Sequence, residues 1–272
     1  SLRRMGPFRV QRPPLRSRLR SALHATRRPA AGLALAFGLI AAASWLPLRA
    51  APPTPQLLQS LEAAFNGEGE LQSLLQSGPG LDPGLVERQR RVLRTQFPDA
   101  RWQFTPGPAQ GDGRSTVTVL VRGSRQDGPL RFRLQAEQQL ALDSDGSRIT
   151  SQTVLREQSI LRSGEADLAV TLQIPDVVLT GQRYDVDVLL DEPLEGAIVA
   201  GGIVELTPGQ ATSLESPSLQ LGALGGGGLF RTVQAPLAPG SQTWAVLLVH
   251  PQGLLSVSKR VRVVADKAQL RP

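Results

Sequence analysis

Residues 130–140 read Leu-Arg-Phe-Arg-Leu-Gln-Ala-Glu-Gln-Gln-Leu, and this stretch decides how the first half of the chain folds. Apolar and polar side chains alternate along it, so that Phe132 and Leu134 fall on one side and Arg133 on the other. Successive side chains of an extended chain point to opposite faces. The two-residue period therefore predicts a strand with one buried face and one solvated face.

Further strands are expected before and after this one. Residues 115–123 and 148–161 show a similar extended pattern, and residues 101–105 are compatible with a first strand. The linkers at 126–129 and 143–146 contain the Asp and Gly residues of tight hairpin turns. Short turns between consecutive strands predict an antiparallel meander.

Helices are predicted ahead of the meander, at residues 56–65 and 85–97, with a short helical turn at 71–75. Each of the two longer helices follows a Thr-Pro or Asp-Pro pair, in which the first residue caps the helix and proline takes its first position. Residues 54–162 are therefore predicted to form an α+β antiparallel roll. Its element order is similar to that of nuclear transport factor 2-like and cystatin-like domains.

From residue 163 the helical period disappears, and a β-sandwich is predicted over 163–266, followed by a tail at 267–272. In the stretch 174–188, Ile-Pro-Asp-Val-Val-Leu-Thr-Gly-Gln-Arg-Tyr-Asp-Val-Asp-Val, a proline precedes the first strand and a turn glycine leads into an aromatic residue and alternating valines. This pattern resembles the opening of bacterial immunoglobulin-like and fibronectin type III-like modules. The resemblance implies an immunoglobulin-like sandwich, with Trp244 as a core aromatic. The expected strands are 167–174, 182–190, 196–206, 228–235, 241–250 and 255–264, with an extra one near 218–221.

Residues 1–53 are predicted to form a basic leader, with an uncharged apolar run at 29–48, Pro-Ala-Ala-Gly-Leu-Ala-Leu-Ala-Phe-Gly-Leu-Ile-Ala-Ala-Ala-Ser-Trp-Leu-Pro-Leu. About 20 apolar residues in a helix span a hydrocarbon core of about 30 Å, and the positive flank holds the N-terminus in the cytoplasm. The run is either an anchor helix in the inner membrane or a signal peptide cleaved near residues 41–43 or 48–50. Both interpretations place the rest of the chain outside the cytoplasm, in a periplasmic, lumenal or secreted location.

The net charge of +7 is unevenly distributed. Residues 1–53 hold ten arginines and no acidic residue, which leaves twenty basic residues against all 23 acidic ones, a net charge of −3, in the rest of the chain. A slightly acidic body has no general attraction for polyanions, so we expect no nucleic-acid partner. The absence of cysteine excludes disulfides, thiolate catalysis and Cys-ligated metal sites.

Residue types suited to catalysis are scarce after the leader. His250 is the single histidine there, and it precedes a Pro-Gln-Gly turn, so we interpret it as a turn residue and expect no enzyme activity. Residues 143–146, Asp-Ser-Asp-Gly, start like a calcium loop, but its twelfth position is Val154 and not a carboxylate. The acidic residues from Asp185 to Glu195 suit either calcium binding or a solvated strand face, and we favour the solvated face. No cofactor and no metal is predicted.

Two groups of side chains are candidates for binding. An apolar pocket between helix and sheet is expected to be lined by Leu93, Phe97, Trp102, Phe132 and Leu134. A basic face on the second helix suits an anionic partner, such as a lipid headgroup or an acidic protein, and consists of Arg88, Arg90, Arg91 and Arg94.

These features together predict an exported or membrane-anchored, non-catalytic protein that acts in protein interaction or scaffolding in the cell envelope. The leader could also attach it to the membrane through residues 29–48. A carrier of a small ligand in the apolar pocket is the alternative. A carboxylate-based hydrolase ranks last, because the acidic residues are mostly in turns.

Overall fold

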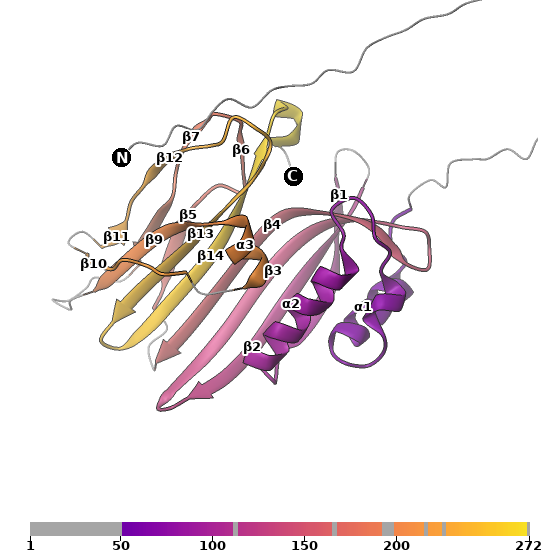
Figure 1. Ribbon diagram of the computed structural model, residues 1–272, viewed down its shortest axis with the longest axis horizontal. Coiled ribbons are helices and arrows are strands. Elements are labelled where there is room, and N and C mark those ends of the chain that lie inside the picture. The colour runs from indigo at the N-terminus through magenta and orange to yellow at the C-terminus, as the bar shows by residue number, and fades with distance from the viewer. Residues whose placement is uncertain are drawn as a thin grey trace, which may run out of the picture. The chain divides into compact units, whose positions relative to one another are not determined.

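The computed structural model describes residues 51–110, 114–164, 168–191, 199–214, 217–224 and 227–270. They belong to one compact unit, Leu46–Pro272, built mostly of antiparallel β-sheet with a small helical part (Figure 1). The predicted leader helix at 29–48 lies outside the described residues. Within the described residues, no helix has the length and apolar character needed to cross a membrane.

The helices that precede the sheet are α1 (Pro55–Phe65), the 3-10 helix η1 (Leu71–Leu74) and α2 (Pro83–Gln96). Both predicted caps are present. The hydroxyl of Thr54 accepts a hydrogen bond of 3.1 Å from the backbone N–H three residues later. The Asp82 carboxylate accepts bonds of 2.9 and 3.1 Å from two N–H groups of the first turn of α2.

One large sheet organises the molecule. Its strands, in spatial order, are β1 (Arg101–Ala109), β2 (Ser115–Asp127), β3 (Leu130–Ser144), β4 (Ile149–Gly164), β14 (Gly253–Val264), β13 (Gly240–His250), β9 (Ala200–Leu206) and β10 (Gly222–Ala223), while β6 (Val177–Leu179) pairs in parallel with β14. The meander from β1 to β4 agrees with the sequence prediction. The pairing of β4 with β14 was not predicted, because it joins strands that are distant in the sequence.

Shorter strands form two small sheets, β11-β8-β5 and β12-β7, which consist of β5 (Val170–Gln173), β7 (Arg183–Asp185), β8 (Asp187–Leu190), β11 (Gly228–Leu229) and β12 (Thr232–Gln234). The strands predicted at 182–190 and 228–235 are each divided in two, because their halves pair in different sheets. The predicted strand near 218–221 is not formed, and β10 follows it.

Two short helices complete the described chain, α3 (Pro208–Ser213) and the 3-10 helix η2 (Lys267–Leu270). Helix α3 was not predicted, although Thr207 and Gln210 form a capping box at its start. Its last turn meets α2, where the Gln89 side chain donates a hydrogen bond of 3.1 Å to the Thr212 carbonyl oxygen.

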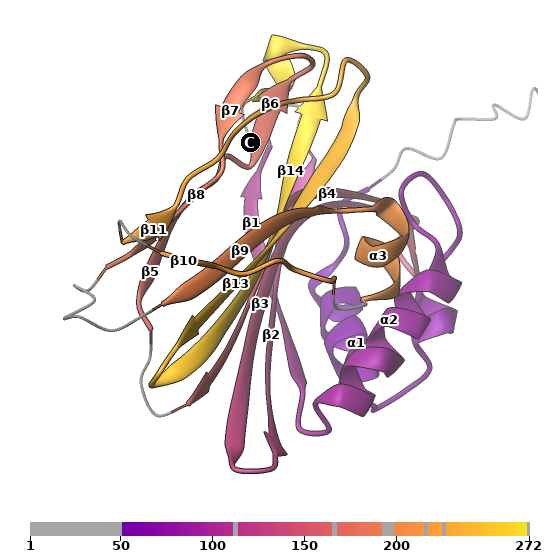
Figure 2. The same cartoon turned by 60° about the vertical axis from the view of Figure 1, so that its left-hand side comes forward.

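The main sheet separates two hydrophobic cores. Helices α1 and α2 pack on one face of β1–β4, where Leu61, Phe97 and Val117 are buried. The small sheets lie on the opposite side, against β13 and β14, and enclose a second core that includes Val186 and Trp244 (Figure 2). Because the two cores pack on opposite faces of the same sheet, this sheet joins the part of the chain around the first core to the part around the second.

The ladder between β4 and β14 is the joint between these two parts. It runs from Gly164, opposite Gly253, to Glu157, opposite Arg260. The predicted boundary at residue 163 therefore falls inside β4. Gly164 has a φ of +96°, and a Cβ there would lie 2.2 Å from the carbonyl oxygen of the turn before β14. Only glycine allows the strands to approach so closely at this end.

Candidate ligand-binding pocket

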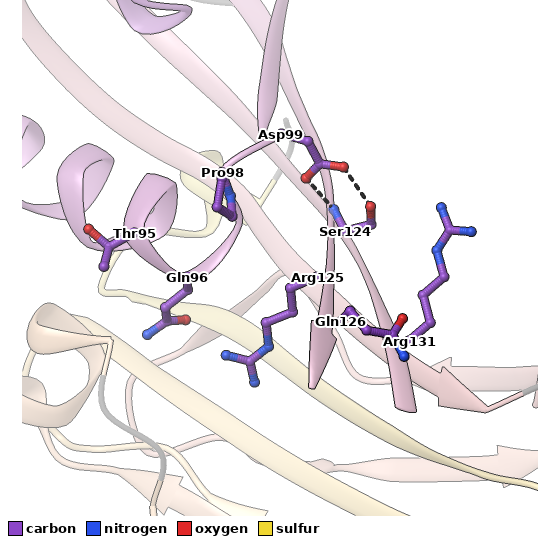
Figure 3. Close-up of a pocket in the computed structure, with 8 residues that line it drawn as sticks. All are labelled: Thr95, Gln96, Pro98, Asp99, Ser124, Arg125, Gln126 and Arg131. Atoms are coloured by element: carbon purple, nitrogen blue, oxygen red, sulfur yellow. Dashed lines mark hydrogen bonds between the residues drawn. The ribbon is translucent and has the colours of Figure 1, made fainter. Parts of the chain in front are cut away.

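An open pocket of about 540 Å³ lies where α2 ends beside the tip of the β2–β3 hairpin (Figure 3). Helix α2 and the loop that follows it supply one wall, and the two strands supply the other. The lining residues are polar or charged except for one proline, and they are Thr95, Gln96, Pro98, Asp99, Ser124, Arg125, Gln126 and Arg131. An open hollow with charged side chains in its wall can receive a charged group from solution.

Asp99 fixes the loop to the strand at this pocket. The register of β1 with β2 ends at Arg101 opposite Arg122, so β2 continues beyond its partner. There the Asp99 carboxylate accepts hydrogen bonds from the backbone N–H of Ser124 at 2.6 Å and from its hydroxyl at 2.5 Å. These bonds lower the pKa of Asp99 below its ordinary value. The carboxylate is consequently ionised and already engaged.

The most unusual group of the pocket is the guanidinium of Arg125. It lies over the ring of Phe97, with 5.3 Å to the centroid, and over the ring of Phe132, with 5.0 Å to the centroid. Its Nε atom is buried without a hydrogen-bond partner, and it forms no ion pair with a described residue. Two aromatic faces can hold a cation in place while leaving its N–H groups available for an anion.

Arg131 is the second cation of the pocket, and it belongs to the other side of the strand pair. It stands opposite Gln126 in the β2–β3 register, whereas Arg125 stands opposite Phe132. Adjacent positions of a strand face opposite sides of the sheet. In Figure 3 the two arginine side chains accordingly extend in different directions. Arg125 and Arg131 thus reach the open pocket, called the Arg125 pocket from here on, from opposite faces of the strand pair.

The five residues of the predicted apolar pocket come together in the first core. Phe97 and Trp102 are buried there, and Leu93, Phe132 and Leu134 pack against the same cluster. None of the five is among the residues that line the open pocket. Their connection with it is indirect, because Phe97 and Phe132 are the two rings that hold Arg125.

The four arginines of the predicted basic face on α2 differ in exposure: two are half-buried and two are exposed. Arg90 is bound by Glu87 through two hydrogen bonds of 2.9 Å, which lower the pKa of Glu87. Arg94 lies against Gly67, with its Nη1 atom 2.6 Å from the position that a Cβ of Gly67 would take. Arg88 and Arg91 are exposed, and Arg91 is 3.7 Å from Glu87. Two of the four arginines, Arg90 and Arg94, are thus half-buried, and the other two are exposed.

The other polar groups chosen from the sequence have partners within the fold. His250 accepts a hydrogen bond of 3.1 Å at Nδ1 from the N–H of its turn. The Asp145 carboxylate accepts three bonds in the hairpin between β3 and β4, and they lower its pKa to about 2. Asp185 and Asp187 accept bonds from β12 and the residue before it; Glu192 and Glu195 lie outside the described residues. No group of three or more acidic or histidine side chains in the described part could hold a metal ion.

Arg125 was not predicted as a site residue, although the sequence contains a signal for it. Val117, Val119 and Val121 alternate along β2 and face the first core, and Arg125 continues the same phase. A charged residue on the buried face of a strand is an exception to the apolar pattern, and such an exception indicates a candidate site.

A family model described as a domain of unknown function (DUF8623) matches residues 165–264. This match covers the strands from β5 to β14, and the Arg125 pocket lies outside it. No curated protein matches the chain at a significant level.

Proposed function

We propose that the protein is a non-catalytic interaction protein, and that the Arg125 pocket receives an anionic group of its protein partner. The observation that carries this proposal is the guanidinium held between Phe97 and Phe132 without an ion-pair partner among the described residues. A carboxylate is the matching group, because a guanidinium presents paired N–H donors to its two oxygens. The open form of the pocket suits a side chain or chain terminus of another protein.

We further propose that the chain is exported or anchored in the membrane, so that this interaction takes place in the cell envelope. The arginine-rich leader and its 20-residue apolar run support this location. N-terminal sequencing of the mature protein tests it, because a cleaved chain begins after the apolar run and an anchored one retains it.

An immunoglobulin-like sandwich is our proposal for residues 163–266. In its favour are the proline, glycine and aromatic pattern of residues 174–188 and a core that includes Tyr184 and Trp244. Modules of this kind commonly serve as interaction or spacer units, which agrees with a non-catalytic role.

A quantitative pull-down from detergent-solubilised membranes of the source cells tests the binding role. The bait is the full chain, compared with Arg125→Gln and with Arg183→Gln, which removes an exposed arginine on β7, away from the pocket. We expect a partner that is retained by the wild type and by Arg183→Gln, and is at least tenfold depleted with Arg125→Gln. Equal capture by all three baits would refute the role of the pocket. A hydrolase activity abolished by His250→Ala would refute the non-catalytic assignment.

A further inference from the structure

A second, smaller cavity lies where the main sheet splits. Beyond Arg260 strand β14 leaves β4 and pairs in parallel with β6, beginning at Arg262 opposite Val177. We call the place where β14 leaves β4 and joins β6 the fork. A space of about 210 Å³ lies in the fork, beside η2. It is lined by Gln139, Leu155, Arg156, Asp176, Val177, Arg262 and Leu270. Its walls therefore come from segments between β3 and η2 that are distant in the sequence and that the fold brings together.

A β-bulge shapes one wall of the fork. Gln139 pairs with Arg156 and the next residue, Leu140, pairs with Val154, so Leu155 is an extra residue in β4. A bulge shifts the alternation of a strand by one position and re-aims the side chains beside it. Here it places Arg156 in line with Gln139, and both line the cavity.

Among the described residues that line the cavity, Asp176 is the single carboxylate, and it already has cationic partners. Asp176 is bound by the ammonium group of Lys259, whose side chain is 3 % exposed. Arg156 lies farther away, with its Nε atom 3.6 Å from the same Asp176 oxygen. Asp176 carries one negative charge against the three cations Lys259, Arg156 and Arg262, so two positive charges remain in excess at the cavity.

Arg262 is poorly compensated where it lies. Its Nε atom is buried and has no hydrogen-bond partner, and one terminal nitrogen makes a long bond of 3.4 Å to the Gln269 carbonyl oxygen. Burial lowers the pKa of Arg262, the nearby cations Arg114 and Arg260 lower it further, and the Asp176 carboxylate partly opposes them. A buried donor without an acceptor is costly. An anion in the cavity would supply acceptors and offset the repulsion among the cations.

We propose that this cavity binds a phosphate group, held between Arg156 and Arg262. Two arginines in excess match the charge of about −1.5 to −2 that a phosphate group carries at neutral pH. The volume is below the range of about 300–1,000 Å³ that is typical of sites for drug-sized ligands, so a single small group suits it. The site is separate from the Arg125 pocket, and the proposal does not depend on the function proposed above.

Calorimetry with inorganic phosphate and the full chain in mild detergent tests the site directly. The variants are Arg156→Gln and Arg262→Gln, with Arg183→Gln, an exposed arginine on β7, as the matched control. The side chain of Arg156 is 45 % exposed, so this variant should fold even where Arg262→Gln does not. A lost charge-assisted hydrogen bond weakens binding by about tenfold or more. We expect that loss with Arg156→Gln and none with Arg183→Gln.

Free phosphate and the monoester headgroup of phosphatidic acid present the same chemistry, so a second measurement distinguishes these sources. Flotation compares vesicles of phosphatidylcholine with vesicles that also contain phosphatidic acid. Capture that requires phosphatidic acid and Arg156, and that inorganic phosphate competes away, identifies a lipid headgroup. Calorimetric binding without such capture identifies a soluble phosphate compound. The proposal is overturned when neither measurement detects binding, or when Arg156→Gln binds as tightly as the wild type.

Discussion

Replacement of Tyr184 by phenylalanine tests how the second core is held together. The Tyr184 hydroxyl accepts a hydrogen bond of 2.9 Å from the indole N–H of Trp244 and donates one of 2.8 Å to the side-chain oxygen of Gln242. The Gln242 side chain donates in turn to Glu205 at 3.1 Å. Because all three members of the chain from Trp244 to Gln242 are buried, water has little access to groups that lose a partner.

The expected cost follows from those two bonds. Phenylalanine preserves the shape of the ring, so no cavity forms, but it leaves one buried donor and one buried acceptor without a partner. Each such group costs about 1–3 kcal/mol, and with partial relaxation we expect a loss of about 2–4 kcal/mol in the free energy of unfolding. That is a large share of the roughly 5–15 kcal/mol that stabilises most proteins.

Urea denaturation followed by tryptophan fluorescence and by circular dichroism measures this loss. The control is Thr232→Val, which removes an exposed hydroxyl that donates to Asp185 at 2.7 Å. It should change the free energy by about 0.5 kcal/mol or less. If Tyr184→Phe costs no more than Thr232→Val, the buried chain does not stabilise the second core and the reasoning is wrong.

Three further predictions concern the same core and the sheet. Burial raises the pKa of Tyr184 above its ordinary value near 10. The stability that the protonated hydroxyl contributes is therefore present below pH 10 and is lost as the pH rises through the raised pKa. Urea titrations over this pH range should show a loss of stability for the wild type and none for Tyr184→Phe. Gly164→Ala should lower the free energy of unfolding by about 2 kcal/mol or more in urea titrations, because the position combines a positive φ with a close backbone contact. Trp102 and Trp244 report on different cores, and since the cores share one sheet, single-tryptophan variants should give coincident unfolding curves.

Local chemistry made the helices and the meander predictable from the sequence. The caps at Thr54 and Asp82 act on N–H groups only two or three residues away. The alternation over residues 130–140 indicates one buried face. The short linkers that contain Asp and Gly form tight turns, so each strand pairs with the one before it. Each of these signals lies within a few residues of the element that it determines.

Long-range pairing was not predictable in this way. Nothing in the sequence of β4 marks Ser159 as the neighbour of Ser258, yet their hydroxyl oxygens are 2.7 Å apart in the shared ladder. The division of residues 182–190 into β7 and β8 likewise depends on the strands that pair with each half. Arg125 could be identified as an exception to its strand, but its two aromatic contacts depend on the α2 loop and on β3.

Net charge describes long-range attraction and says nothing about local sites. A body with a charge of −3 has no general attraction for polyanions, but the fork of the sheet brings Arg156 and Arg262 together from distant parts of the sequence. Salt separates these two effects, because exposed charges are screened within about 10 Å at 0.1 M ionic strength and buried ones much less. Phosphate binding in the fork should therefore weaken less with added sodium chloride than partner binding at the open Arg125 pocket. Equal salt dependence of the two would contradict a phosphate site that is more enclosed than the Arg125 pocket.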